Sequence, residues 1–262
     1  MGLAYSIMEL YEKAIDALDF AIAIEPHFIP AHFSKAQCYE QMEMYTQAIN
    51  VYKQTMEFEK PDAMVYYYIG DCYESLNNFS IALDYYRKAV GLERQFADAW
   101  MGVGICLNEL GQHSEAVSNM AQAVKLEPEN AEFWYIYADA LLDDSQPDEA
   151  EKAFEEVIKL DPEHQEIWLD YSDFYAHNRN DYDKAIELIE EGAYHQPTNS
   201  SISYRLVAYL LESGREKEAI RELYIALSQN YENHVYLLEY SEKARMTQAV
   251  IDAISSFSRY TE

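Results

Sequence analysis

Cysteines, histidines and a pair of glycines are the residues of this sequence that could do chemistry. Cys38, Cys72 and Cys106 lack the CxxC spacing that zinc and redox sites use. His27 and His32 stand five residues apart, a spacing that brings two imidazoles poorly to one metal ion. Gly102 and Gly104 resemble the start of a dinucleotide-binding loop, but they lie in a stretch that has helical periodicity. We therefore expect no metal ion, no nucleotide and no other cofactor.

Catalytic motifs are also missing from the sequence. It contains no GxxxxGK phosphate loop, no HExxH metal motif and no GxSxG nucleophile elbow. No set of residues therefore stands out as catalytic, and we expect the chain not to be an enzyme.

The spacing of the cysteines points to the elements that position them. The intervals between them are 34 and 34 residues, and one alanine recurs with the same period over most of the chain: Ala14, Ala48, Ala82, Ala116, Ala150, Ala185 and Ala219. A fixed period of this length is typical of repeat architectures. Equivalent residues of neighbouring repeats are about 8–10 Å apart when helices pack, and a disulfide needs Cα atoms within about 7 Å. The cysteines are thus predicted to be buried thiols.

Each repeat reads as two amphipathic helices joined by a short turn. In residues 97–130, one helical face carries Trp100, Gly104 and Leu107, and a second helix follows a turn at Gly111. The second helix ends before Pro128, since proline cannot continue a helix. Small residues such as Gly104 are predicted where two helix backbones approach closely.

These columns resemble the tetratricopeptide repeat (TPR) family. One signature is Trp134, Tyr137, Ala138, Leu141, Ala150, Phe154, Val157 and Pro162. The resemblance implies an all-α fold, an α-solenoid of about seven helix pairs wound into a right-handed superhelix. It also implies one domain over 1–262, with repeats at 1–28, 29–62, 63–96, 97–130, 131–164, 165–199 and 200–233, and a divergent C-terminal helix pair at 234–262.

Two repeats depart from the regular pattern. The sixth carries one extra residue, which we expect in the turn at 178–181. The first begins within its first helix and lacks about six residues, so we expect a longer parent protein. The sequence shows no signal peptide, which favours a cytoplasmic location.

The net charge restricts the partners. Acidic residues outnumber basic ones by 47 to 19, for a net charge of -28. Nucleic acid binding needs clustered Lys and Arg, so nucleic acid is excluded as a partner. No apolar run approaches the length of a membrane-spanning helix, which excludes membrane insertion. The charge favours basic partners.

The TPR resemblance implies a binding groove lined by the first helices of the repeats. The residues expected to face it combine an aromatic and apolar stripe with acids: Phe33, Gln37, Tyr67, Asp71, Glu74, Met101, Tyr135, Asp139, Asp143, Leu169, Asp173 and Tyr204. Aromatic side chains dominate interface energies. The stripe could equally pack helix on helix, with the acids as ordinary solvated surface.

The resemblance therefore predicts a protein-interaction scaffold that holds a peptide or protein segment of basic and apolar character. One TPR subclass grips a C-terminal carboxylate with Lys, Arg and Asn, but Phe33, Tyr67, Gln37 and Asp71 occupy those columns here. Two alternatives stay open. The chain could be a structural module that self-associates end to end, or it could select substrates for a larger protein.

Overall fold

Helices make up most of the described residues. The computed structural model describes residues 2–261, without the side chains of 3, 4 and 258–261. No strand occurs in this range. The all-α prediction is confirmed.

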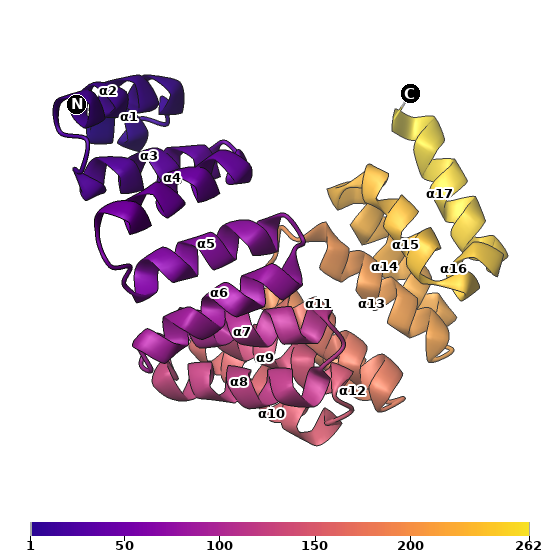
Figure 1. Cartoon of the computed structure of the whole chain (residues 1–262). Coiled ribbons are helices and arrows are strands. Elements are labelled where there is room, and N and C mark those ends of the chain that lie inside the picture. Colours follow the sequence, from indigo (N-terminus) through magenta and orange to yellow (C-terminus); the bar gives the residue numbers. More distant parts are fainter. Residues whose placement is uncertain (1, 262) are drawn as a thin grey trace. The chain divides into compact units, whose positions relative to one another are not determined.

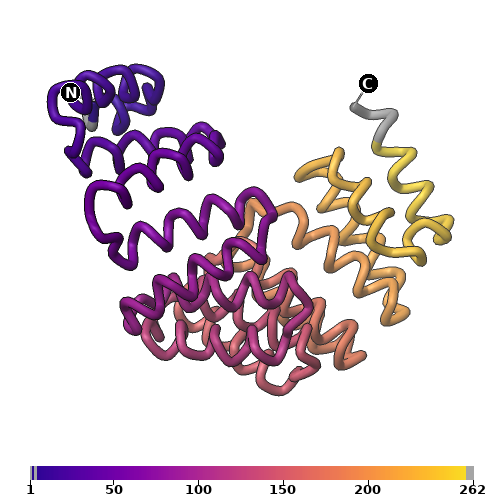
Figure 2. Tube along the Cα trace, viewed as in Figure 1, coloured from indigo at the N-terminus to yellow at the C-terminus, as the bar shows by residue number. Residues whose placement is uncertain are grey.

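The chain forms two compact units, divided between Gln146 and Pro147. Figures 1 and 2 show their helices in chain order, coloured from indigo to yellow. The first unit contains α1 (Gly2–Ile7), α2 (Tyr11–Ile24), α3 (Ile29–Gln41), α4 (Tyr45–Phe58), α5 (Ala63–Ser75), α6 (Phe79–Leu92), α7 (Ala97–Glu109), α8 (His113–Leu126) and α9 (Ala131–Asp143). Each helix packs against the next along the chain. The division falls between the two helices of the fifth predicted repeat.

The second unit follows the same plan with more irregular elements. It contains α10 (Pro147–Leu160), α11 (Ile167–Asp173), a π-helical turn (Phe174–Asn178), α12 (Tyr182–His195), α13 (Ser200–Glu212), α14 (Glu216–Gln229), a 3-10 turn (Tyr231–Asn233), α15 (His234–Tyr240), α16 (Glu242–Met246) and α17 (Gln248–Thr261). The single domain over 1–262 and the right-handed superhelix stay predictions.

The repeated small residues lie at the helix contacts, as the sequence predicts. All seven repeat alanines are completely buried. A Cβ atom on Gly104 would stand 2.3 Å from Cγ of Met120, inside van der Waals contact. The three cysteines are buried free thiols. These columns are therefore determined by the close approach of helices.

A left-handed residue ends the first helix of each of the seven repeats. It stands five residues before the repeat alanine and has positive φ in every case: Glu9, Glu43, Asn77, Gly111, Ser145, Asn180 and Gly214. This conformation favours glycine, yet glycine occupies only two of the seven positions. The turn therefore does not depend on glycine.

Three tryptophans donate hydrogen bonds to the loops between consecutive repeats. The indole Nε1 of Trp100 donates to the carbonyl of Arg94 at 2.9 Å. Trp134 donates in the same way to Pro128 at 2.9 Å, and Trp168 to Pro162 at 2.8 Å. Each bond spans six residues, so the tryptophan column fixes the entry into the first helix of three repeats.

The extra residue of the sixth repeat lies in a π-helical turn. The amide of Arg179 donates to the carbonyl of Phe174, five residues back. Since Asn180 keeps its place five residues before Ala185, the insertion is absorbed before the tight turn. The expected position within 178–181 was therefore slightly too late in the sequence.

The C-terminal segment differs from the expected helix pair. Residues 234–261 form three helices, because the chain breaks at Ser241 and Thr247, which both have extended backbone angles. The Ser241 side chain caps α16 by accepting a hydrogen bond from the amide of Ala244. The segment therefore has one more helix than the expected divergent pair.

Candidate functional site

Four of the predicted groove residues come together in the first unit. Tyr67, Asp71, Glu74 and Met101 line a pocket of about 160 Å³, which we call the acidic pocket. Its other lining residues are Tyr86, Asp98, Gly102, Ile105, Phe133 and Ile136. The pocket thus contains three carboxylates and three aromatic rings.

Helical spacing explains why these residues share one pocket. Tyr67, Asp71 and Glu74 lie at intervals of four and three residues and therefore on one face of α5. Asp98, Met101 and Gly102 occupy the corresponding face of α7. Phe133 and Ile136 continue the wall on α9. All three helices are the first helices of their repeats.

Gly102 brings the Tyr86 ring into the pocket wall. A Cβ atom on Gly102 would stand 2.6 Å from Cζ of Tyr86, so any larger residue would displace the ring. The Tyr86 hydroxyl donates to Oε2 of Glu74 at 2.8 Å. The glycine therefore allows a hydrogen bond that fixes one of the three carboxylates.

The carboxylates of the acidic pocket lack a positive partner. Burial raises the pKa of Asp71 and of Glu74, and for Asp98 burial and the charge of Glu127 do the same. No Lys or Arg is among the described residues that line the pocket. Asp71 accepts no hydrogen bond from any described part of the chain. The pocket is therefore a site where a positive charge would be stabilised.

A related arrangement lies one repeat earlier. The thiol of Cys72 donates to Oε1 of Glu40 at 3.1 Å, and burial raises the pKa of Glu40 to about 7. The thiol of Cys106 lies 4.0 Å from Oε2 of Glu74. The cysteine column thus meets buried carboxylates, and burial raises the pKa of both thiols, which leaves them protonated and unreactive.

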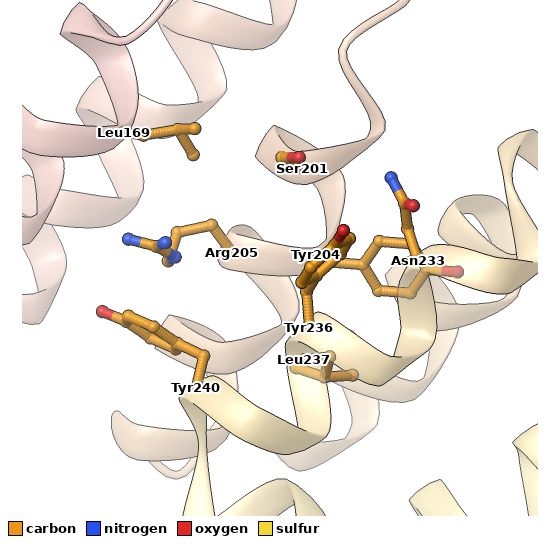
Figure 3. A pocket seen from close by; sticks show the side chains of 8 residues that line it. All are labelled: Leu169, Ser201, Tyr204, Arg205, Asn233, Tyr236, Leu237 and Tyr240. Atoms are coloured by element: carbon orange, nitrogen blue, oxygen red, sulfur yellow. The ribbon is translucent and has the colours of Figure 1, made fainter.

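A second pocket, of about 200 Å³, lies in the second unit (Figure 3). Two predicted groove residues, Leu169 of α11 and Tyr204 of α13, line it together with Ser201, Arg205, Asn233, Tyr236, Leu237 and Tyr240. We call it the Arg205 pocket. No carboxylate is among the described residues that line it.

Asp173 lies beside this pocket and is neutralised within the chain. It accepts hydrogen bonds from Arg205 and Tyr209, and a third from the hydroxyl of Tyr240 at 2.5 Å. His177 lies 3.9 Å away and bonds the same Tyr240 hydroxyl at 2.7 Å. Asp173 is therefore not a free acid for a basic partner.

Comparison with known proteins identifies the family of this chain. Residues 9–249 match the sequence profile of the cilia and flagella-associated protein 70 C-terminal domain. The chain belongs to this family. The match covers most of the chain and, with the structural neighbours below, makes it a TPR protein.

Solved TPR structures show the same fold at low sequence identity. The C-terminal part of a TPR repeat-containing protein from Cytophaga hutchinsonii is 15% identical, with a TM-score of 0.74 over 96% of this chain and 97% of its own. MamA from Desulfovibrio magneticus RS-1 is 19% identical, with a TM-score of 0.60 over 65% of this chain and 96% of its own. YrrB is 22% identical, with a TM-score of 0.53 over 63% and 86%. No curated protein matches the chain.

The other predicted groove residues of this TPR protein lie outside both pockets. Phe33 contacts the rings of Tyr52 and Tyr68 edge-on and so contributes to packing. Gln37, Asp139 and Asp143 are exposed and Tyr135 is half-buried. Asp143 accepts a hydrogen bond from Nδ2 of Asn108 at 2.6 Å.

The sequence did not single out several lining residues. Tyr86 stands in a column that reads as core, and Asp98 lies one helical turn before the Met101 column. Tyr240 is 67 residues from Asp173 and has no periodic relation to it. A search for charged residues one turn from the expected stripe would have found Asp98, but not Tyr240.

Other kinds of site are not evident in the described residues. Between residues 2 and 261, no group of three His, Cys, Asp or Glu side chains is arranged to hold a metal ion. In the same range, no helix has the length and apolar character needed to cross a bilayer.

Proposed function

We propose that this TPR protein is an interaction scaffold, and that its acidic pocket receives a partner segment with basic and apolar side chains. The proposal depends mainly on one observation: Asp71, Glu74 and Asp98 line a pocket without a cation. A Lys or Arg side chain would pair with these acids while it contacts aromatic faces, which adds about 0.5–2 kcal/mol where water is excluded. We expect no intrinsic turnover.

The neighbouring rings supply the apolar part of this recognition. Tyr67 and Met101 stand beside the acids, and Phe133 closes the wall on α9. Charge attraction should speed association and weaken as salt rises, whereas apolar contacts should persist and determine the dissociation rate. YrrB is described as a TPR protein with an unusual peptide-binding site, which supports the same role here.

A charge-matched pair of variants tests the proposal. The probe is an acetylated ten-residue peptide that alternates Lys with Leu, compared with its Glu-for-Lys counterpart. Asp71→Asn with Glu74→Gln should weaken the Lys peptide about tenfold, equivalent to ~1.4 kcal/mol. Glu57→Gln with Asp84→Asn removes the same charge from exposed positions on α4 and α6 and should have little effect.

The two variants separate specific from general attraction. Equal weakening by both would mean that the peptide responds only to the net charge, and the acidic pocket would not be the site. Tyr67→Ala should speed dissociation at any salt concentration. Recovery of partners from native extract with the wild-type chain, and their loss with the pocket variant, would extend the test to natural ligands.

End-to-end self-association is a second candidate, favoured by an exposed apolar face on α2. Phe20 is 75% exposed and Ile24 is 86% exposed. Such residues mark contact surfaces when they gather on one face. Sedimentation velocity should then show concentration-dependent dimers that Ile24→Lys abolishes, and a monomer at every concentration would refute this candidate.

A further inference from the structure

The Arg205 pocket differs in charge from the rest of this acidic molecule. Of the described residues that line it, Arg205 alone carries a charge, although acids outnumber bases 47 to 19 over the chain. The walls are mostly apolar or aromatic, from Leu169, Tyr204 and Leu237. Its volume of about 200 Å³ is below that of sites for drug-sized ligands. The pocket therefore fits a single side chain.

Arg205 is held with unused hydrogen-bond donors. One terminal nitrogen bonds Asp173, and the guanidinium lies over the Tyr240 ring at 3.8 Å from its centroid. The side chain is only 19% exposed, and its other N–H groups make no hydrogen bond within residues 2–261. A guanidinium has five donors, and the Arg205 donors that do not bind Asp173 stay accessible at the pocket rather than buried. This geometry points to an acceptor supplied from outside.

The charge of Arg205 is retained despite this burial. Burial by itself lowers the pKa of the guanidinium, but the charge of Asp173 and the hydrogen bond to it raise the pKa above its ordinary value. Asp173 also accepts from two tyrosine hydroxyls, so its capacity is shared among three donors. A second carboxylate could therefore bind the free edge of Arg205.

The occupant follows from the arrangement of these groups. In Figure 3 the guanidinium points to one side of the pocket, away from Tyr236 and Asn233. The apolar group and the carboxylate would then be two separate side chains, which neighbouring residues of one segment can supply. The Ser201 hydroxyl, which makes no hydrogen bond in the described part of the chain, is a further donor at the rim.

We propose that the Arg205 pocket is a second binding site, which takes an aromatic or large apolar side chain of a partner segment together with the acidic side chain next to it. The site does not depend on the acidic pocket, since the two lie in different units and favour opposite charges. Failure of one assignment leaves the other unaffected.

Two matched probes test this inference. They are N-acetyl-Phe-Glu amide and N-acetyl-Phe-Gln amide, which differ only in the carboxylate. Each probe is titrated into the whole 15N-labelled chain and followed by NMR. The Glu probe should shift the amides of Leu169, Ser201 and Arg205. Its Kd should be at least about fivefold lower than that of the Gln probe, since hydrogen bonds to charged groups are the stronger ones.

Variants distinguish the pocket from a general effect. Arg205→Gln with Asp173→Asn removes both charges together, which avoids an unpaired carboxylate, and should abolish the preference for Glu. Ser201→Phe should block both probes, and Asp71→Asn should change neither. An N-acetyl-phenylalanine arm tests a terminal carboxylate, and stronger binding of that arm than of the Glu probe would overturn the choice of an acidic side chain.

Two other results would overturn the proposal. Equal affinity of the Glu and Gln probes would show that Arg205 does not bind the ligand. No shift of the Arg205-pocket amides with either probe, or shifts confined to another surface, would show that the pocket is not a binding site. A thermal melt of each variant, expected within a few degrees of wild type for the charge-neutral pair, confirms that binding is measured on folded protein.

Discussion

Asp71 and Asp173 occupy the same column of the repeat but have opposite surroundings. Asp71 stands in a pocket without a cation, whereas Asp173 bonds a guanidinium and two tyrosine hydroxyls. The difference comes from one position of the following repeat, fourteen residues before its alanine. That position holds Arg205 beside Asp173 and Gly102 beside Asp71.

The comparison shows how one substitution in a repeat changes the charge of a pocket while the helices keep their arrangement. Arg205 crosses from α13 to neutralise the acid on the preceding repeat. Gly102 has no side chain to do so, and the space is taken by the Tyr86 ring. One residue therefore decides whether the carboxylate is available to a partner or used inside the fold.

Removal of Arg205 from its ion pair with Asp173 should have the largest effect on stability. Arg205→Ala leaves Asp173 partly buried with hydroxyl donors but no cation, so we expect a loss of about 3 kcal/mol in the free energy of unfolding. The control is Arg87→Ala, which breaks an exposed pair with Glu115 and should cost only about 0–1 kcal/mol. Denaturant unfolding of both variants measures the difference, and equal losses would contradict the assigned role of Asp173.

Substitution of Gly102 should have the next largest effect on stability. Gly102→Ala pushes a Cβ atom into the Tyr86 ring and should cost about 1–3 kcal/mol by overpacking. Gly91→Ala is the control. Gly91 lies on α6, the same helix as Tyr86, and no atom lies within 4 Å of the position that its Cβ would take. It should stabilise the protein by about 0.5–1 kcal/mol. Thermal melts that rank the two variants in the reverse order would refute the packing assignment.

The uncompensated acids of the first unit should make stability depend on pH. The pKa of Glu40 is raised from 4.5 to about 7, so the folded state binds this proton more tightly than the unfolded state. Stability from this group is complete below the ordinary pKa and is lost as pH rises to about 7, by about 1–3 kcal/mol after allowance for solvent. Unfolding at pH 5 and pH 8 should show a smaller difference in Glu40→Gln than in wild type, and parallel profiles would disprove this account.

Substitution of Asp71 should have the smallest effect on stability among these variants. Asp71→Asn removes an unpaired charge without changing shape, so at pH 8 it should leave stability unchanged or raise it by about 0.5 kcal/mol. Asp173→Asn makes the same exchange where the charge is paired and should destabilise clearly. Paired denaturant curves at one pH decide this, and a loss of stability in both would mean that Asp71 has a partner.

The fold follows from the sequence further than the sites do. The repeat alanines from Ala14 to Ala219 are buried where adjacent helices approach closely, and only a small residue fits there. Periodicity alone therefore locates these positions. Tyr67, Asp71 and Glu74 meet because helical spacing places them on one face. The bond between Tyr240 and Asp173 spans two repeats and depends on how helices of the second unit are rotated, which the spacing does not encode.

The short C-terminal helices were missed for a different reason. Helices of five to seven residues have too little periodicity to be recognised, and their ends depend on single caps. Ser241 provides such a cap, and its bond to Ala244 separates α15 from α16. The resulting position of Tyr240, the last residue of α15, then completes the surroundings of Asp173.

The π-helical turn at Phe174–Asn178 has a consequence for changes in chain length. A residue added to an α-helix rotates everything beyond it by about 100°, which would turn buried faces outward in a stack of repeats. Here the wider turn takes up the added residue at once, and Asn180 and Ala185 keep the spacing of every other repeat. The end of a first helix is thus a place where a repeat protein can gain or lose one residue while its neighbours stay in phase.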